Sequence, residues 1–167
     1  MALKSDRSTL QTDISFFMNE AATRGGCVVL SAGGSGASMD NGAALVTYTH
    51  ASGLAPMGIL LNDMVNIDLT RQHLNQHKDE VQKGGKVTIL QKGWVVTSSL
   101  ACSVAPVAGH PAHVTLLGEI ANSGGNISDQ SSTANSPIGT FLSGIDEDGY
   151  AKVYVDLPST PVRVRNL

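Results

Sequence analysis

Eighteen glycines divide this chain of 167 residues into short runs rich in valine, isoleucine, leucine and threonine. Such runs have the length of β-strands, about four to eight residues, and turn-forming residues separate them. The pattern predicts an all-β domain. The predicted strands cover residues 27–31, 43–49, 58–61, 64–69, 86–90, 93–98, 113–117, 138–143 and 150–157.

The two halves of the chain resemble each other. The first half reads "GGCVVL", "AALVTY" and "APMG", and the second reads "KGWVVT", "PAHVTLL" and "SPIG". Proline fixes φ at the start of a strand, and glycine allows a bulge or a close backbone approach. Neither half alone would bury enough surface, so we predict an internally duplicated small β-barrel or sandwich. The alignment pairs Val28-Val29 with Val95-Val96, Val46 with Val114, and Pro56-Met57-Gly58 with Pro137-Ile138-Gly139.

The segments outside these runs suggest the domain organisation. Residues 1–24 precede the first predicted strand and are expected to form an extended N-terminal arm. Residues 70–85 lack a β-branched run until Val81, which favours a short helix or an ordered surface connector. The predicted order is the arm, a first β repeat (25–69), the connector (70–85), a second β repeat (86–158) and a C-terminal tail (159–167).

Composition narrows the possible partners. The net charge is −3, and the longest basic cluster is Arg163 with Arg165, so we expect no nucleic-acid partner. No apolar run reaches the roughly 18 residues of a membrane span, and the N-terminus lacks the apolar core of a signal peptide. We therefore expect no membrane insertion and a cytoplasmic chain. In that compartment Cys27 and Cys102 are expected to be reduced and buried rather than paired.

Several residue groups invite a chemical interpretation, but each has a simpler one. His73 and His77 have the spacing of two metal ligands on a helix, yet a third ligand is missing; His110 and His113 flank a turn. The glycine-rich "SAGGSGASMDNG" lacks the residues of a phosphate-binding loop, so a plain loop is favoured. No serine lies in a G-x-S-x-G motif. We expect no enzyme activity, no metal and no cofactor.

The acidic segment "GIDEDGY" also resembles a site. Asp63 and Asp68 with Asp146, Glu147 and Asp148 could form paired carboxylates, but nothing in the sequence places them across a cleft. Aspartate followed by glycine favours a tight turn. The segment is therefore predicted to be the solvated tip of a hairpin between residues 138–143 and 150–157.

The order of these patterns resembles the capsid decoration, or cement, proteins of tailed bacteriophages. The resemblance rests on strand patterning in Gly93 to Thr97, Gly109 to Leu116, Ile138-Gly139 to Ser143 and "YAKVYVDL" from Tyr150 to Leu157, and on "PMGILLNDMVNIDL" with the residues that follow it up to Thr97. It covers most of residues 25–158.

The resemblance implies a structural virion protein that binds the outside of a capsid and bridges capsomers. It would bind the major capsid protein, form a homo-oligomer, most simply a trimer, and lie on the virion surface after assembly in the host cytoplasm. Ile14, Phe16 and Phe17 in the arm are then the candidate capsid contacts, since burial of each is worth about 1.5–3 kcal/mol. The alternatives are a receptor- or glycan-binding head or tail accessory protein that uses the polar loop 121–136, and a small hydrolase.

Overall fold

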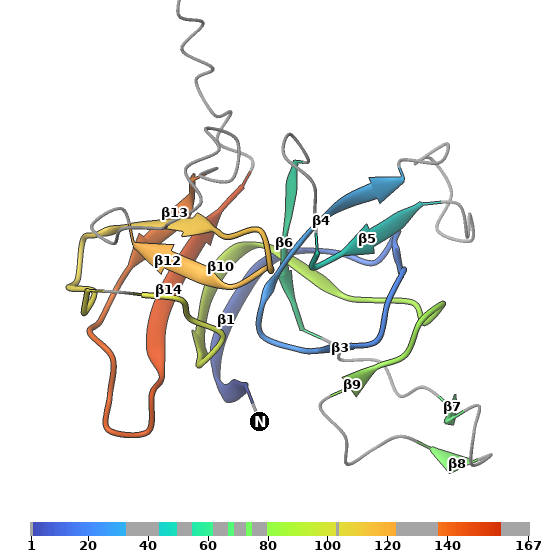
Figure 1. Cartoon of the computed structure of the whole chain (residues 1–167), viewed down its shortest axis with the longest axis horizontal. Coiled ribbons are helices and arrows are strands. Elements are labelled where there is room, and N and C mark those ends of the chain that lie inside the picture. The colour runs from blue at the N-terminus through green and yellow to red at the C-terminus, as the bar shows by residue number, and fades with distance from the viewer. Residues whose placement is uncertain are drawn as a thin grey trace, which may run out of the picture.

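The computed structural model describes residues 2–32, 44–49, 55–61, 67–68, 73–74, 80–102, 104–122 and 137–157. The all-β prediction is confirmed, because these residues contain strands and turns but no helix (Figure 1). The strands are β1 (Leu3–Asp13), β2 (Phe17–Met18), β3 (Ala22–Thr23), β4 (Cys27–Ala32), β5 (Leu45–Thr47), β6 (Pro56–Leu60), β7 (Ile67–Asp68), β8 (His73–Leu74), β9 (Glu80–Val81), β10 (Ile89–Thr97), β11 (Pro111–Val114), β12 (Ile120–Asn122), β13 (Pro137–Phe141) and β14 (Ala151–Asp156).

One large sheet contains ten of the strands. Its order is β12-β11-β13-β14-β10-β6-β4-β5-β2, and β1 pairs with β10 beside this path. The sheet is mixed, because β2 and β5 run parallel, and its described strands do not close into a barrel. Figure 1 shows two lobes: β11 to β14 form one, β2 to β6 form the other, and β1 and β10 run between them.

The strand registers support the duplication but change its alignment. In the first half β4 lies between β5 and β6, and in the second half β11 lies between β12 and β13. Val28 is opposite Gly58 and Val29 is opposite Pro56, with a register shift between the two pairs. The same shift separates Ala112 opposite Gly139 from His113 opposite Pro137. Strand β4 therefore corresponds to β11.

Each repeat contains five strands in the same spatial order. The first is β5-β4-β6-β10-β1 and the second is β12-β11-β13-β14-β10. Strand β10 belongs to both, since Ile89 and Leu90 pair with β6 while residues 92–97 pair with β14. A parallel contact also recurs, between β2 and β5 in the first repeat and between Leu100 and Ile120 in the second.

Two of the three predicted alignments are therefore wrong. Val28-Val29 corresponds to residues of β11 rather than to Val95-Val96, and Val46 corresponds to Ile120 rather than to Val114. Short valine-rich strands resemble one another in sequence whatever their partners are. Only the alignment of the two Pro-x-Gly segments holds, because it depends on backbone geometry rather than on apolar composition.

The two Pro-x-Gly glycines occupy positions that exclude a side chain. A Cβ built on Gly58 would collide with the carbonyl oxygen of Leu90, and one on Gly139 would collide with that of Tyr154. In each repeat the glycine thus lets β6 or β13 approach the following strand closely, as the sequence predicts.

Residues 3–23 do not form a separate arm. Strand β1 pairs with β10 from Leu3 to Asp13, and Leu3, Phe16 and Met18 are buried. The sequence conceals this strand because its apolar residues are few: only Leu3 and Leu10 among eleven residues of mostly polar side chains. The composition of this segment does not predict a strand, and it is the pairing with β10 that makes it one.

The predicted connector is β-structured where it is described. Strand β9 pairs with β3 and is followed by a turn, and β8 pairs with β7. Other parts of the 70–85 segment, and most of the predicted strand 64–69, lie outside the described residues. So do residues 159–167 of the predicted tail.

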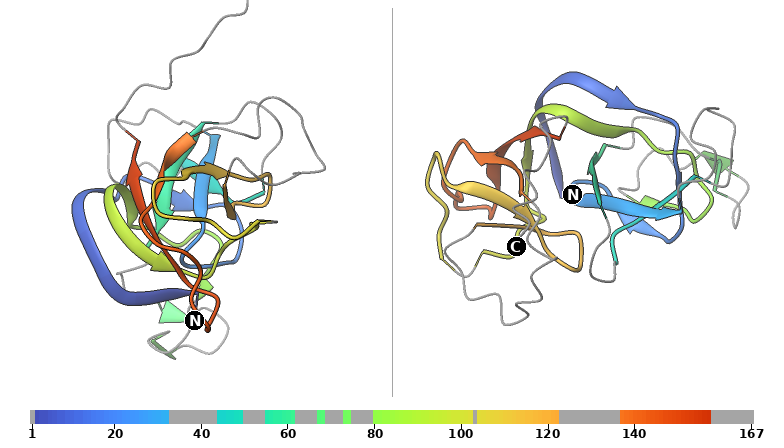
Figure 2. Two further views of the ribbon diagram at one scale, coloured as in Figure 1. Left: turned by 90° about the vertical axis from the view of Figure 1, so that its left-hand side faces the viewer. Right: turned by 90° about the horizontal axis from the view of Figure 1, so that it is seen from above.

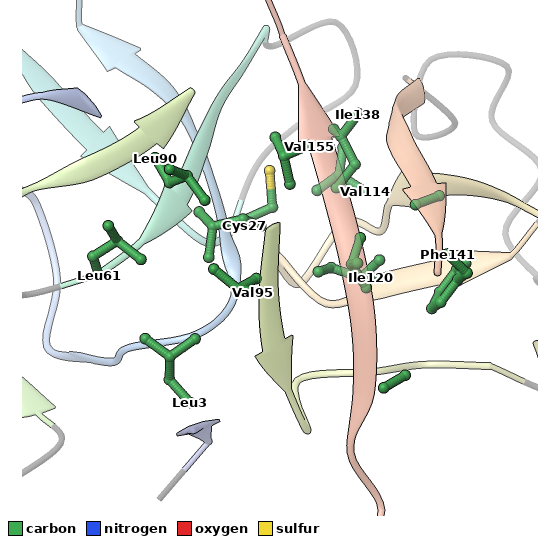
Figure 3. Packing of buried hydrophobic residues seen from close by; sticks show 14 of the residues in the cluster. Leu3, Cys27, Leu61, Leu90, Val95, Val114, Ile120, Ile138, Phe141 and Val155 are labelled. Carbon is green, nitrogen blue, oxygen red and sulfur yellow. The ribbon is translucent and has the colours of Figure 1, made fainter. Parts of the chain in front are cut away.

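Two hydrophobic clusters lie on opposite sides of the central strands. Neighbouring residues in one strand point to different clusters: Ile59 belongs to the first and Leu60 to the second, and the same alternation separates Val29 from Val28. Figure 3 shows the first cluster, in which Val95, Ile120, Phe141 and Val155 converge from different strands. Because both faces of these strands are buried, their sequences read as continuous apolar runs.

Both cysteines are free thiols, as expected, although Cys102 is only half-buried. Complete burial raises the pKa of Cys27 to about 12. We expect a disulfide reagent to modify Cys102 in the folded protein and Cys27 at least about a hundredfold more slowly. A Cys102→Ser variant should incorporate no label until urea unfolds it; rapid labelling of that variant would contradict the burial of Cys27.

Candidate functional site

The three predicted contact residues occupy different environments. Ile14 keeps 37% of its surface exposed, whereas Phe16 is buried in the second hydrophobic cluster. Phe17 is half-buried, with the Lys86 ammonium 5.9 Å from its ring centre. Phe16 is therefore a core residue rather than a surface contact, because it packs in the same buried cluster as Met18 and Val46. Among the three, Ile14 is the residue most open to a partner.

The candidate metal and catalytic residues do not converge where they are described. Among the described residues, no three histidine, cysteine, aspartate or glutamate side chains come close enough together to hold a metal ion. His110 Nδ1 accepts a hydrogen bond from the Val107 amide at 3.3 Å, which fixes a turn. His77, Asp63 and most of the glycine-rich segment lie outside the described residues.

The acidic segment is the hairpin tip that the sequence predicts. Asp146 and Tyr150 pair through the Asp146 N–H, and the Asp146 side chain closes the turn. Its Oδ1 accepts hydrogen bonds from the amides of Asp148 at 3.1 Å and Tyr150 at 2.7 Å. The Tyr150 amide and the hydrogen bond from Lys4 hold the pKa of Asp146 below its usual value. This carboxylate therefore builds the turn.

Lys4 ties the hairpin tip to the first strand. Its Nζ lies 2.9 Å from Asp146 Oδ2, 3.8 Å from Asp148 Oδ2 and 4.2 Å from the centre of the Tyr150 ring. The hydrogen bond to Asp146 raises the pKa of Lys4. Sequence reasoning missed this contact because 142 residues separate the two side chains along the chain.

Acid should weaken the hairpin tip. A carboxyl group with a depressed pKa in the folded state stabilises the fold above its unfolded pKa, and this contribution disappears as the pH falls through the folded value. We expect Asp146→Ala to lower the Tm at pH 7 and to have a smaller effect below pH 3. Glu147→Ala, on the same turn, is the matched control and should have little effect at either pH. Asp146→Asn, which retains the acceptor oxygen, should fall between them in thermal melts.

Three exposed apolar side chains lie on two adjacent loops of the second repeat. Val107, Leu142 and Ile145 are each more than 40% exposed. The loops are joined by two hydrogen bonds of 2.8 Å, from the Gly109 amide to the Phe141 carbonyl and from the Phe141 amide to the His110 carbonyl. We name Val107, Leu142 and Ile145 the apolar corner. The backbone of the buried residue Phe141 therefore holds the two loops together.

The outer face of the second repeat carries the single tryptophan. Trp94 lies opposite Tyr154, and the Lys152 ammonium lies 3.4 Å from the Trp94 ring centre. Lys92 and Asp156 form an ion pair at 3.6 Å on the same two strands. The Lys152 ammonium covers the Trp94 ring in a cation–π contact, so the tryptophan already has a partner within the chain.

A shallow depression of about 300 Å³ lies where the two repeats meet. It is lined by Gln11, Pro56, Met57, Gln91 and Leu157. The two glutamine side chains bond to each other, Gln11 Nε2 to Gln91 Oε1 at 3.0 Å. None of the described residues that line it is charged, so this lining offers little for the binding of a charged ligand.

Comparisons with known proteins leave the family open: no protein-family model and no curated protein matches this sequence. In the part of the chain that the structure describes, no helix is long and apolar enough to cross a membrane. The candidate function therefore rests on the surface of the molecule and on the resemblance in strand patterning.

Proposed function

We propose that this chain is a structural virion protein that binds the outer surface of a bacteriophage capsid and bridges its capsomers. The apolar corner is the observation that carries the proposal. Its three exposed side chains lie on loops that hydrogen bonds join, and neighbouring exposed apolar groups are typical of protein contacts rather than of catalysis. The low charged fraction of 15% agrees, because a surface of neutral polar groups loses little hydration when another protein covers it.

The proposed mechanism is mechanical. Val107, Leu142 and Ile145 would be buried against the major capsid protein, each contributing at most about 1.5–3 kcal/mol. Many copies on one shell would raise the total affinity if neighbouring copies also touch. No catalytic step, metal or cofactor enters this function, and the protein would be found on the virion surface after assembly in the host cytoplasm.

Co-sedimentation with undecorated capsid shells tests the proposal. We expect the wild-type protein to pellet with shells in a saturable way. The double variant Val107→Asp with Ile145→Asp should weaken this binding at least about a hundredfold, because two apolar contacts become charged. Leu117→Asp is the matched control, since Leu117 is also exposed but lies on the β11–β12 turn. Wild-type protein that stays in the supernatant at every shell concentration would rule the proposal out.

The second candidate function is a receptor- or glycan-binding accessory protein. It depends on the polar loop 121–136, of which only Ala121 and Asn122 are described. Glycan-array binding that is lost when this loop is shortened would favour it. Retention of shell binding by the same shortened variant would favour decoration.

A further inference from the structure

The turn that carries Val107 has a counterpart in the first repeat. Since β4 corresponds to β11, Gly25 corresponds to Gly109, and both glycines have a left-handed φ, of 111° and 93°. The Gly25 amide donates to the Leu60 carbonyl at 2.9 Å, and the Gly109 amide donates to the Phe141 carbonyl at 2.8 Å. The right-hand view of Figure 2 shows the two lobes side by side, with the light blue β4 in one and the gold β11 in the other. The two turns therefore share one backbone geometry.

The first repeat fastens its turn with a tyrosine and a strand. The Tyr48 hydroxyl donates to the Thr23 carbonyl at 2.5 Å and accepts a hydrogen bond from the Gly26 amide at 3.1 Å. Burial raises the pKa of Tyr48, so its hydroxyl keeps its proton near neutral pH. Thr23 also pairs with Glu80 of β9.

The second repeat fastens the equivalent turn differently. Asn122 stands at the position that corresponds to Tyr48, and its shorter side chain donates to the Val104 carbonyl at 3.1 Å. Within the described chain no strand pairs with Val107. Instead the His110 amide donates to the Val107 carbonyl at 3.0 Å, and the His110 Nδ1 accepts a hydrogen bond from the Val107 amide at 3.3 Å. The imidazole of His110 thus holds a residue of the apolar corner.

This bond depends on the protonation of the imidazole. A ring nitrogen accepts a hydrogen bond only when it carries no proton, and a histidine side chain changes its charge between about pH 5 and 8. In the imidazolium form both ring nitrogens are donors, so the Nδ1–H would face the Val107 N–H. The bond then breaks, and Val107 loses its link to the His110 side chain.

Other titratable groups lie on the elements beside this turn. Where the structure describes them, they belong to His113, Asp146, Glu147, Asp148, Tyr150, Lys152 and Tyr154. Asp146 and Asp148 lie beside Lys4, and no hydrogen bond or ion pair joins any group of this described set to the His110 side chain. The protonation of His110 is therefore the change that acts directly on the Val107 amide.

We propose that His110 is a positioning residue of the apolar corner, and that its neutral imidazole keeps Val107 in the geometry that binds the partner. Binding weakens as the pH falls from about 7.5 to 5.5, because protonation releases the Val107 turn. The inference rests on the proposed function for the identity of the partner, which is the capsid. The link between His110 and Val107 belongs to the free protein and is measurable without any partner.

Nuclear magnetic resonance of the free, nitrogen-15-labelled chain tests this link. We expect the Val107 amide resonance to shift with pH along the same titration curve as the His110 ring protons. His110→Asn should remove the shift, since an asparagine oxygen accepts a hydrogen bond at every pH. The Gly26 amide, which Tyr48 holds in the equivalent turn, is the internal control and should stay constant. A Val107 amide that does not follow the His110 ring would overturn the inference.

Co-sedimentation with undecorated shells at about pH 7.5 and 5.5 tests the consequence for binding. We expect the wild-type affinity to fall about threefold to tenfold at the lower pH, the factor that one hydrogen bond represents. His110→Asn should bind equally at both pH values, and His110→Ala should bind at both with the weaker affinity. Every other histidine is unchanged in these variants, so none of them can cause the difference.

The two experiments separate this inference from the proposed function. Equal losses of affinity on acidification for the wild type and for His110→Asn would overturn the inference, because the pH dependence would arise elsewhere. Absence of shell binding at both pH values would overturn the proposed function, and the Val107 titration in the free protein would still decide whether His110 positions Val107.

Discussion

Gly139→Val should abolish the folded state. A Cβ at this position would collide with the Tyr154 carbonyl oxygen, and it would lie 3.0 Å from the Cα of Val155. Both are backbone atoms of β14, so relief requires that one whole strand move. Overpacking typically costs 1–3 kcal/mol and occasionally more, and here we expect about 3 kcal/mol for Gly139→Ala. The branched valine should exceed about 5 kcal/mol, which is comparable to the total stability of a small domain.

Urea unfolding followed by Trp94 fluorescence and circular dichroism measures this effect. Gly149→Ala is the matched control, because Gly149 has a φ of 83° but no atom within 4 Å of its added Cβ. It should lose only about 1–2 kcal/mol, the cost of a left-handed backbone for alanine. A Gly139→Val protein that unfolds at the wild-type urea concentration would show that β13 and β14 do not approach so closely.

Gly58→Ala should also destabilise the fold by about 3 kcal/mol or more. Gly58 combines a φ of 142° with a collision against the Leu90 carbonyl oxygen. Similar losses at Gly58 and Gly139 would indicate that the two repeats rely on the same close approach. A loss at one glycine alone would mean that the repeats differ in this respect.

Val153→Asp should produce the second large effect. Val153 is fully buried in the first hydrophobic cluster, opposite Val95 on one side and Phe141 on the other. A carboxylate there would lose its hydration and find no cation among the apolar residues of that cluster. We expect a loss of more than about 4 kcal/mol, and therefore a largely unfolded protein at 37 °C.

Two further variants, one at Val153 and one at Thr140, separate the effect of charge from the effect of lost volume. Val153→Ala removes apolar contacts without adding charge and should cost about 2–3 kcal/mol. Thr140→Asp places the same carboxylate on the exposed side of β13 and should change stability by less than about 1 kcal/mol. If Val153→Asp and Thr140→Asp had equal midpoints in urea, β14 would have to present its other face to the core.

Sequence reasoning succeeded where neighbouring residues decide the structure. The alternation from Ala151 to Asp156 marked β14, and the aspartate–glycine turn marked its hairpin. The two Pro-x-Gly segments marked β6 and β13 as equivalent strands. Each of these features depends on the residues of a turn or on the alternation of apolar and polar residues. Both can be recognised from a few consecutive residues.

The residues of the candidate surface were predicted from the sequence much less well than the strands. Phe16 was selected because two adjacent aromatics stood in a supposed arm, but the fold buries it. The apolar corner combines Val107 with Leu142 and Ile145, which no local pattern connects.

The amino-acid sequence by itself determined the all-β class, the hairpin at residues 138–157 and the existence of a repeat. The tertiary structure decided which strands correspond, that β1 joins the sheet, and that β10 serves both repeats. The physical reason is that strand pairing depends on the backbone hydrogen bonds and buried neighbours of distant segments. Valine-rich strands are nearly interchangeable in sequence, so only their partners in the folded chain distinguish β4 and β11 from β10.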